Sequence, residues 1–380
     1  MRKFLTGMLV LILAFSASGV SVLANARDVA TLAGMRGHGD DDGDRPQFNL
    51  PRGILAGSDG VYVADTFNNL IRQVSLNGYG RTLTGGFIGL DAHRFPVGQY
   101  RDGAIANALF NRPGDLAFGN GGNILILDTS NHAVRIIMRQ NVFTLAGGGE
   151  PGFADGTSAD AKFNTPSAMV VDGQGNIYIA DSGNHVIRRI GTNGRVTTVA
   201  GVAGEHGHND GTAREALFDS PAGITMGEDG RIFVADTGNH LIRMIHNGRV
   251  TTVAGARVLA NEIDFDITYN ANEWDNIPIG DFADGRANAA RFNMPMGLAM
   301  WGDVLIVADT ANHRIRAVAP SGNVTTIAGD GYASGTDGAL SNATFHLPQG
   351  VSVFGDNLFV ADTGNNAIRT INLSAVGNIR

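Results

Sequence analysis

Residues 235–243 read Ala-Asp-Thr-Gly-Asn-His-Leu-Ile-Arg, and close variants of this stretch occur six times along the 380-residue chain. Each copy keeps an Asp, an Asn three residues later and an Arg seven residues later. A Phe precedes each Asp by 17 or 18 residues and is itself followed three residues later by Pro. The repeated pairs are Asp65 and Arg72, Asp128 and Arg135, Asp181 and Arg188, Asp236 and Arg243, Asp309 and Arg316, and Asp362 and Arg369. Self-similarity at a roughly constant interval of about 50 residues predicts a propeller or a solenoid.

Each copy contains four short runs with the composition of β-strands. In the third copy these runs are residues 168–171, 176–180, 186–190 and 196–200, and Gly, Asn and Asp turn residues separate them. Short strands at even spacing with such turns indicate an all-β repeat protein. We therefore expect an all-β fold, namely a six-bladed β-propeller of four-stranded antiparallel blades. The blades should start near residues 48, 110, 163, 218, 292 and 345.

The two ends of the chain complement each other. The last copy stops after its third strand-like run, around residues 367–371. Residues 28–34 match the fourth run of other copies, residues 195–201 and 249–255. We expect this N-terminal strand to complete the last blade, which closes the ring and removes exposed sheet edges.

The N-terminus has the three parts of a secretory signal peptide. Arg2 and Lys3 are basic, residues 4–15 are apolar, and Ala24-Asn25-Ala26 provides small residues before a cleavage site. We expect residues 1–26 to be a signal peptide and residues 27–380 to be a single propeller domain. This pattern predicts a secreted or extracytoplasmic protein, in the periplasm or at the cell surface, with no transmembrane segment after cleavage.

Composition excludes several classes of protein. The chain has no cysteine, so it has neither a disulfide scaffold nor a thiolate metal site. Removal of Arg2 and Lys3 with the signal peptide leaves 26 basic and 36 acidic residues, a net charge of −10. No basic stripe is present, so we do not expect a nucleic acid partner. The negative charge instead favours a cationic or neutral partner.

The repeat resembles the NHL-repeat family. Asn239-His240-Leu241 is the NHL tripeptide itself, and related tripeptides occur at the same place in the other copies. The resemblance covers residues 28–371 and implies the propeller fold. It implies no single function, because NHL propellers serve as extracellular sensor domains, protein-interaction modules, RNA-binding domains and a peptide-amidating lyase.

The six-fold repetition of the Asp, Asn and Arg residues favours a structural role for them. A catalytic site needs different groups that converge on one point. We expect each Asp to pair with an Arg of its own or the next blade, and each Asn to hold the turn between the second and third strands. The histidines beside these Asn residues should be turn residues too, namely His132, His185, His240 and His313.

A second repeated element is Asp-Gly in the connectors between blades. It occurs at residues 102–103, 155–156, 210–211, 284–285 and 337–338. We expect a tight turn there, with a ligand- or calcium-binding rim as the alternative. Residues 40–44 separately resemble the start of a calcium loop, which makes Asp40, Asp42 and Asp44 weak calcium candidates. Otherwise we predict no cofactor and no metal site.

Departures from the repeat are the candidate functional positions. Two connectors are long, from Gly85 to Phe110 and from Gly255 to Phe292, and they should flank one mouth of the channel on opposite sides. Candidate ligand-binding residues on them are Phe265, Tyr269, Trp274, Arg94 and Tyr100. The inner strands should line the channel, which adds the candidates Arg52, Arg112, Asp115, His346 and Gln349.

These observations favour a non-enzymatic, monomeric binding module. It would recognise a protein, peptide or glycan on the face that bears the long connectors. One alternative is a metal-dependent lyase or hydrolase at the channel mouth. However, His346 is the one histidine among the entrance positions that would correspond to the three zinc ligands of the amidating lyase. Another alternative is a structural component of the cell envelope. We assign no catalytic residue.

Overall fold

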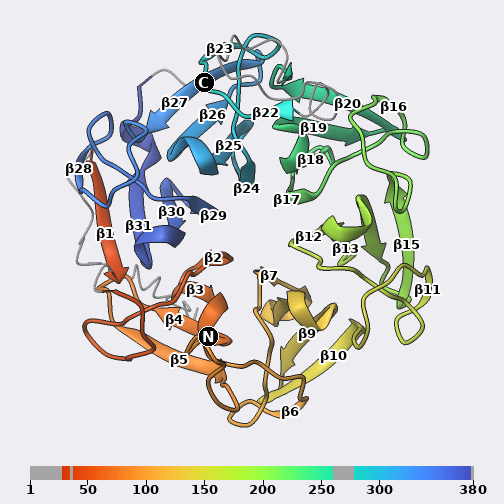
Figure 1. Cartoon of the computed structure of the whole chain (residues 1–380), viewed down its shortest axis with the longest axis vertical. Helices are drawn as coiled ribbons and strands as arrows, with labels where there is room; N and C mark the ends of the chain where they lie inside the picture. The colour runs from red at the N-terminus through yellow and green to blue at the C-terminus, as the bar shows by residue number, and fades with distance from the viewer. Residues whose placement is uncertain (1–27, 35–36, 260–277, 378–380) are drawn as a thin grey trace, which may run out of the picture.

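The computed structural model confirms an all-β six-bladed propeller (Figure 1). It describes residues 28–34, 37–259 and 278–377, and the expected signal peptide, residues 1–26, lies outside these ranges. Six antiparallel sheets surround a central channel, and each sheet runs from an inner strand at the channel to an outer strand at the rim. None of the described helices has the length and apolar character needed to cross a membrane.

The strands follow the chain from the channel outward in every blade. Blade 1 consists of β2 (Ile54–Gly57), β3 (Gly60–Asp65), β4 (Leu70–Val74) and β5 (Gly80–Gly85). Blade 2 consists of β7 (Asp115–Phe118), β8 (Ile124–Asp128), β9 (Ala133–Met138) and β10 (Asn141–Gly147). Blade 3 consists of β12 (Ala168–Val171), β13 (Ile177–Asp181), β14 (Val186–Ile190) and β15 (Arg195–Ala200). Blades 4 and 5 consist of β17 (Pro221–Met226), β18 (Ile232–Asp236), β19 (Leu241–His246) and β20 (Arg249–Ala254); and β24 (Pro295–Trp301), β25 (Val304–Asp309), β26 (Arg314–Val318) and β27 (Asn323–Ala328).

Blade 6 is built from both ends of the chain. It contains β29 (Pro348–Phe354), β30 (Asn357–Asp362) and β31 (Ala367–Asn372), and β1 (Asp28–Gly34) pairs antiparallel with β31. Val29 lies opposite Ile371, and Gly34 lies opposite Ala367. The first strand is therefore hydrogen-bonded to the last strand, and the blade that holds both is a continuous sheet.

Five blades carry a fifth strand that the sequence pattern did not predict. The Asp-Gly connectors pair with the outermost long strand of the blade that follows them. These short strands are β6 (Gly103–Ala104), β11 (Gly156–Thr157), β16 (Gly211–Thr212), β23 (Gly285–Arg286) and β28 (Gly338–Ala339). In blade 1, Gly43 makes the corresponding bridge to Gly80 through two backbone hydrogen bonds.

Single 3₁₀ turns connect the second and third strands of each blade at one end of the channel. They are η1 (Thr66–Asn68), η3 (Thr129–Asn131), η4 (Ser182–Asn184), η5 (Thr237–Asn239), η7 (Thr310–Asn312) and η8 (Thr363–Asn365). Two further turns lie elsewhere, η2 (Asn120–Gly122) and η9 (Leu373–Ala375). The blade connectors run over the same end, which we call the loop face.

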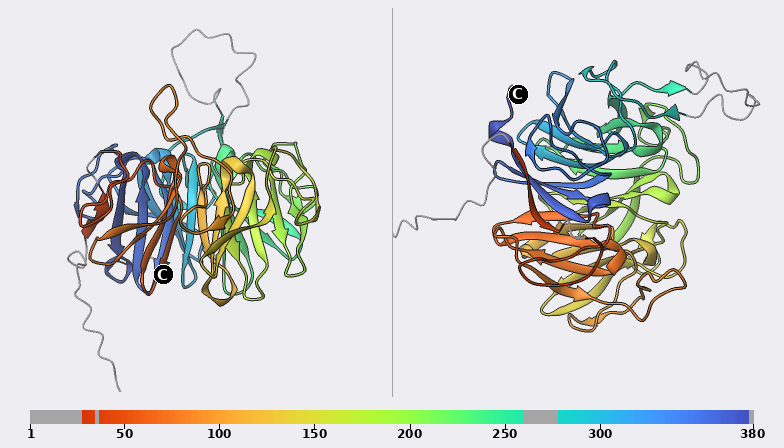
Figure 2. Two further views of the ribbon diagram at one scale, coloured as in Figure 1. Left: turned by 90° about the horizontal axis from the view of Figure 1, so that it is seen from below. Right: turned by 60° about the vertical axis from the view of Figure 1, so that its left-hand side comes forward.

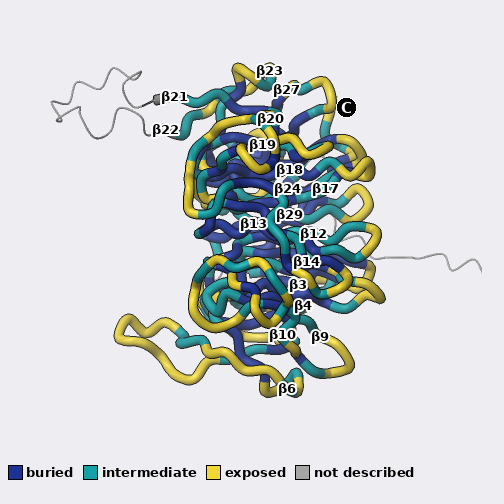
Figure 3. Tube along the Cα trace, turned by 90° about the vertical axis from the view of Figure 1, so that its right-hand side faces the viewer, coloured by how far each residue is buried: buried dark blue, intermediate teal, exposed yellow. Residues whose placement is uncertain are grey.

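The hydrophobic core lies between neighbouring blades (Figure 3). One cluster, for example, joins Phe233 and Ile242 of blade 4 to Phe292, Leu305 and Val318 of blade 5. Alternating strand residues point to the two faces of each sheet, so every blade buries apolar side chains on both sides. Burial of apolar surface between blades thus holds each sheet against the next.

The inner strands approach each other so closely at the channel that four of them need glycine. A Cβ on Gly223 would overlap the carbonyl oxygen of Met296, and one on Gly297 would overlap that of Gln349. Gly350 is equally close to the backbone of Arg52, and Gly53 to the backbone of Asp115. Backbone contact between adjacent blades therefore explains the glycine two residues after the repeated Pro in these four blades.

Replacement of Gly297 by Ala should destabilise the ring. The added methyl would meet the backbone of blade 6, which cannot move without displacing the inner strand, so we expect a loss of about 1–3 kcal/mol in the free energy of unfolding. Thermal or urea unfolding measures this. Gly173→Ala is the control, because Gly173 has open space around it. Equal melting temperatures for the two variants would contradict this account.

Candidate functional site

A buried ion pair occupies the same place in all six blades. The repeated Asp ends the second strand, and the repeated Arg lies on the third strand of the same blade. The guanidinium nitrogen and the carboxylate oxygen are 2.6–3.0 Å apart, and both side chains are fully buried. Each pair therefore belongs to one blade rather than joining two. The ring of the repeated Phe lies 5.0–5.3 Å from the guanidinium carbon.

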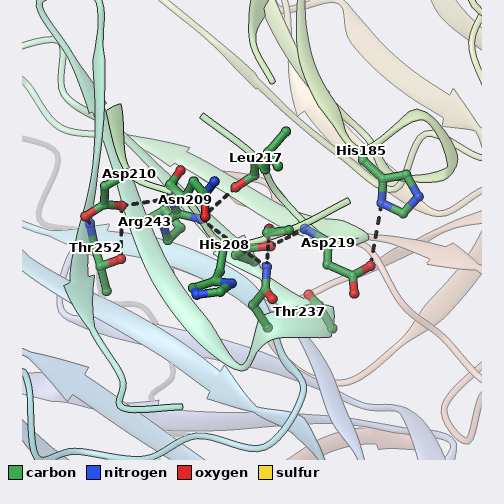
Figure 4. Close-up of polar contacts among 12 residues, drawn as sticks. His185, His208, Asn209, Asp210, Leu217, Asp219, Thr237, Arg243 and Thr252 are labelled. Carbon is green, nitrogen blue, oxygen red and sulfur yellow. Dashed lines mark hydrogen bonds and ion pairs between the residues drawn. The ribbon is translucent and has the colours of Figure 1, made fainter. Parts of the chain in front are cut away.

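Blade 4 shows the whole network around one of these arginines (Figure 4). Arg243 Nη1 donates to Asp236 at 2.6 Å, and Nη2 donates to Asp210 of the preceding Asp-Gly connector at 2.7 Å. The carbonyl of Leu217 accepts a further bond at 3.0 Å. Asp210 also accepts from the backbone N–H of Thr252 on the outer strand at 2.9 Å. The connector aspartate thus fastens the connector to both its blade and the buried cation.

Of the calcium candidates Asp40, Asp42 and Asp44, Asp42 belongs to this network. Its carboxylate accepts from Arg72 Nη2 at 2.7 Å and from Thr82 Oγ1 at 3.1 Å. It is the blade-1 counterpart of the other connector aspartates. The signal was present in the sequence as Asp42-Gly43, but it stands six residues before Phe48 instead of eight. Within the described ranges, no three His, Cys, Asp or Glu side chains gather as a metal site.

The histidine of the NHL tripeptide, or the Asn that replaces it, accepts a hydrogen bond from a backbone N–H of the next blade. His132 Nδ1 accepts from the N–H of Thr165 at 3.0 Å, and Asn69 Oδ1 accepts from the N–H of Arg112 at 2.7 Å. The same bond joins His185 to Ser220, His240 to Met294, His313 to Leu347 and Asn366 to Leu50. All six donor residues have left-handed φ angles between 44° and 49°, so these bonds hold a strained turn at the channel mouth.

The channel mouth on the loop face contains three of the candidate residues. Arg52, Asp115 and Gln349 line a cavity of about 70 Å³, together with backbone of all six inner strands. A second cavity of about 350 Å³ is lined by residues of all six inner strands; most of their side chains are apolar, but polar atoms contribute as much of the exposed lining as apolar atoms. Among the described residues that line the two cavities, Asp115 is the one carboxylate and Arg52 is the one cation.

Asp115 connects two blades. Its Oδ2 accepts from the N–H of Met169 on the neighbouring inner strand at 2.8 Å. Burial raises the pKa of Asp115 to about 7, against the backbone hydrogen bonds from Met169 and Leu116, which lower it. Its carboxylate replaces the direct backbone contact that glycine allows in other blades.

Arg52 has no partner of this kind. Its side chain is half-buried and makes no ion pair or hydrogen bond to the described residues, and its Nε is buried without an acceptor. Burial lowers the pKa of Arg52, and the nearby charge of Arg112 lowers it further. The Oε1 atom of Gln349 is also buried without a partner.

Arg112 and His346 lie at the rim of the mouth. The Arg112 guanidinium is exposed and stacks on Phe67, with 4.8 Å between the guanidinium carbon and the ring centre. His346 contacts the ring of His313 at 5.8 Å between ring centres. Arg52 and Arg112 are thus near enough for their charges to interact, and His313 is the histidine whose ring contacts His346 among the described residues.

The two long connectors project from the loop face on opposite sides of the channel (Figures 1 and 2). In one, residues 86–100 form an arm that bends back at a Leu90–Pro96 bridge, and Asn69 Nδ2 donates to the Pro96 carbonyl at its base. The other begins and ends with the paired strands β21 (Val258–Leu259) and β22 (Pro278–Ile279). The candidates Phe265, Tyr269 and Trp274 lie outside the described residues.

Arg94 and Tyr100 differ in their placement on the first connector. Arg94 is exposed near the tip of the arm. The Tyr100 ring instead stacks on the buried Arg135 at 4.6 Å, and its hydroxyl bonds to Thr144 at 2.5 Å. Tyr100 thus covers the ion pair of blade 2 while remaining 42% exposed, and its role as a ligand contact stays a prediction. Phe153 covers Arg188 in the same way.

The network around the repeated arginine should dominate the stability of each blade. Arg243→Leu leaves Asp236 buried without its cation, so we expect a loss of about 3–5 kcal/mol in the free energy of unfolding. Arg231→Leu is the control in the same blade, because Arg231 pairs with Asp229 at the exposed surface. That control should barely move the melting temperature. Similar losses in both variants would contradict the assignment.

The histidine acceptors should make the ring sensitive to acid. Burial lowers the pKa of His132, His185 and His313, so the unfolded chain binds protons more readily, and stability should fall as the pH drops below about 6.5. Replacing these three histidines by Asn, which blades 1 and 6 use, should reduce the loss of melting temperature between about pH 7.5 and pH 5. His93→Asn, in the exposed arm, should leave the loss unchanged. An undiminished loss in the triple variant would refute this role.

Comparisons with known proteins agree with the geometry. The protein-family model of the teneurin NHL domain matches residues 34–246, more than half of the chain. The family model of the NHL repeat matches residues 292–318. Human NHL repeat-containing protein 2 is 29% identical over 354 residues, which cover 83% of this chain and 45% of that protein. Human Teneurin-4 is 26% identical over 261 residues, which cover 61% of this chain and 9% of that protein. The chain spans less than half the length of these relatives.

A solved structure shows the same fold at low identity. An auxiliary nutrient binding protein from Bacteroides thetaiotaomicron superposes with a TM-score of 0.62 at 16% identity, over 90% of this chain and 76% of that chain. The repeat, the ring of six blades and the matched models lead to one assignment. This chain belongs to the teneurin NHL domain family and is an NHL-repeat β-propeller.

Proposed function

We propose that the protein is a non-enzymatic, extracytoplasmic binding module that holds a polypeptide partner on the loop face. Its N-terminal residues 1–26 would direct export and be removed. The mature propeller, residues 27–380, would act as a monomer. The signal-peptide pattern of residues 1–26 supports export.

The arm formed by residues 86–100 carries the proposal. Four large apolar side chains on it are exposed, namely Phe87, Ile88, Leu90 and Phe95, with exposed fractions from 40% to 60%. The arm projects beyond the disc of blades beside the channel mouth (Figure 2). Large apolar side chains that gather on one projecting segment are typical of a protein interaction site, whereas single ones scattered over a surface need no explanation.

The chemistry of the channel supports binding over catalysis. Asp115 is engaged by the backbone of the next blade, and Arg52 has neither a base nor a nucleophile as a partner. The repeated Asp and Arg residues are occupied by each other in the interior. The auxiliary nutrient binding protein shows that a propeller of this fold can serve a binding role in another protein. The exposed side chains of the arm are apolar, so a polypeptide partner suits the arm better than a glycan does.

Replacing Ile88 and Leu90 by Ser should abolish partner capture without loss of stability. The side chains point to solvent, with exposed fractions of 60% and 53%, so the blades should fold as before. Immobilised protein would be incubated with extracytoplasmic extract from the source cells, and bound polypeptides would be identified and quantified by mass spectrometry. A partner enriched on the wild type should be lost on the variant.

Leu76→Ser is the matched control for this experiment. Leu76 has an exposed fraction of 49% and lies in the turn between β4 and β5, on the face opposite the arm. Its replacement should leave capture unchanged. Equal capture by all three proteins would reject the arm as the binding site, and loss of capture with Leu76→Ser alone would move the site to the opposite face.

A further inference from the structure

The arginine at the channel mouth differs from every other buried arginine described above. The six repeated arginines each have two carboxylates within 3.0 Å. Arg52 has none within the described ranges, although it is half-buried and lines a cavity. Withdrawal of a cation from water without a counter-charge destabilises the folded state, so the position calls for an anion.

A second cation strengthens this local field. Arg112 on blade 2 is close enough to lower the pKa of Arg52, and its own guanidinium contacts Phe67 without an ion pair to the described residues. Asp115 forms no ion pair with either arginine among the described residues, and its carboxylate accepts instead from the N–H of Met169 on blade 3. Two guanidinium groups near one opening attract carboxylates, with which arginine forms paired hydrogen bonds.

The mouth also has room and further polarity for such a group. The cavity of about 70 Å³ is several times the ~10–15 Å³ that a single water molecule needs. Gln349 of blade 6 lines it next to Arg52 of blade 1, and its buried Oε1 has no partner, so its amide can turn to present the NH₂ group. The site thus holds unpaired polar groups on three blades, namely the amide of Gln349 on blade 6 and the guanidinium groups of Arg52 on blade 1 and Arg112 on blade 2.

The rim beside these donors is apolar on one side. Met294 and Leu347 occupy it on blades 5 and 6, with exposed fractions of 47% and 37%. On blades 3 and 4 the rim residues are Thr165 and Ser220. An acidic group that enters the mouth from the side of blades 5 and 6 therefore has apolar side chains next to it.

We propose that the channel mouth is a carboxylate-binding site in which Arg52 and Arg112 hold an acidic side chain of the polypeptide partner. Gln349 donates a further hydrogen bond to it, and the apolar rim contacts the neighbouring residue of the ligand. This inference rests on the proposed function and adds to it the chemical class of the bound segment. The overall charge of −10 would then serve solubility, while the mouth supplies the local attraction.

The test measures binding of defined peptides to the purified full chain by fluorescence anisotropy. The probe is a labelled hexapeptide of alternating Leu and Asp, and its partner has Asn in place of each Asp. We expect the acidic peptide alone to bind, with affinity that weakens at higher salt. Arg52→Gln and Arg112→Gln should each weaken binding about tenfold. Equal binding of the two peptides, or unchanged affinity in Arg52→Gln, would overturn the proposal.

Arg195→Gln is the charge-matched control. Arg195 is exposed at the start of β15, on the face opposite the mouth, so its replacement should leave affinity unchanged. Equal weakening in this variant would show that only net charge matters and would overturn the site. Thermal melting adds a readout that needs no partner. Arg52→Gln should melt no lower than the wild type, because it removes an unpaired cation, and a large fall would show that Arg52 is structural.

Citrate distinguishes a free carboxylic acid from a polypeptide as the ligand. Millimolar citrate should raise the melting temperature of the wild type more than that of Arg52→Gln, since an anion bound to the folded state stabilises it. Citrate that binds more tightly than the acidic peptide would overturn the polypeptide assignment. The Ile88→Ser, Leu90→Ser variant should keep the citrate response, so failure of the arm and failure of the carboxylate site are separable.

Discussion

A guanidinium buried between two carboxylates is the interaction on which every blade depends. Burial of an arginine side chain costs desolvation free energy. This cost is offset only when the guanidinium donors and the facing carboxylates are all hydrogen-bonded. This requirement ties four separate pieces of each repeat to one point: the end of the second strand, the third strand, the connector and the outer strand. It accounts for the fixed spacing of Asp, Asn and Arg, because a shift of one residue in either strand would turn the partners to opposite faces of the sheet.

The contacts between blades are of a different kind. Apolar clusters fill the space between sheets, glycine allows the inner strands to touch at the channel, and the NHL histidine or its Asn equivalent receives one hydrogen bond from the next blade. Polar networks therefore stabilise each blade internally. Apolar packing and a side-chain hydrogen bond at the channel mouth join each blade to the next. The arm of residues 86–100 and the mouth residues Arg52, Arg112 and Gln349 depart from the repeat, and these are the positions that we propose for recognition.

The spacing of residues was enough to predict six blades and an ion pair in each, because a regular period reflects a regular structure. The two-residue outer strands were not visible, since so short a segment has no alternation to detect. The placement of Tyr100 over Arg135 was missed for a different reason. It depends on the path of a connector, and nothing in an isolated aromatic residue distinguishes a stacking partner from a ligand contact. Likewise, the sequence could not show that Arg52 has no carboxylate partner among the described residues, because its neighbours in space come from other blades. The total charge of the chain pointed toward a cationic partner, whereas the local charge at the mouth favours an anionic one.

The pairing of β1 with β31 has a consequence for how the molecule forms. Thr31 bonds to Asp337, 306 residues further along the chain. Bringing such distant segments together costs about 5 kcal/mol in loop-closure entropy when the intervening chain is flexible, and less once the intervening blades are ordered. Blades 1 to 5 can each assemble from local contacts as the chain emerges, but blade 6 has to wait for its last strand. Synthesis from the N-terminus therefore leaves the ring open until β31 has emerged.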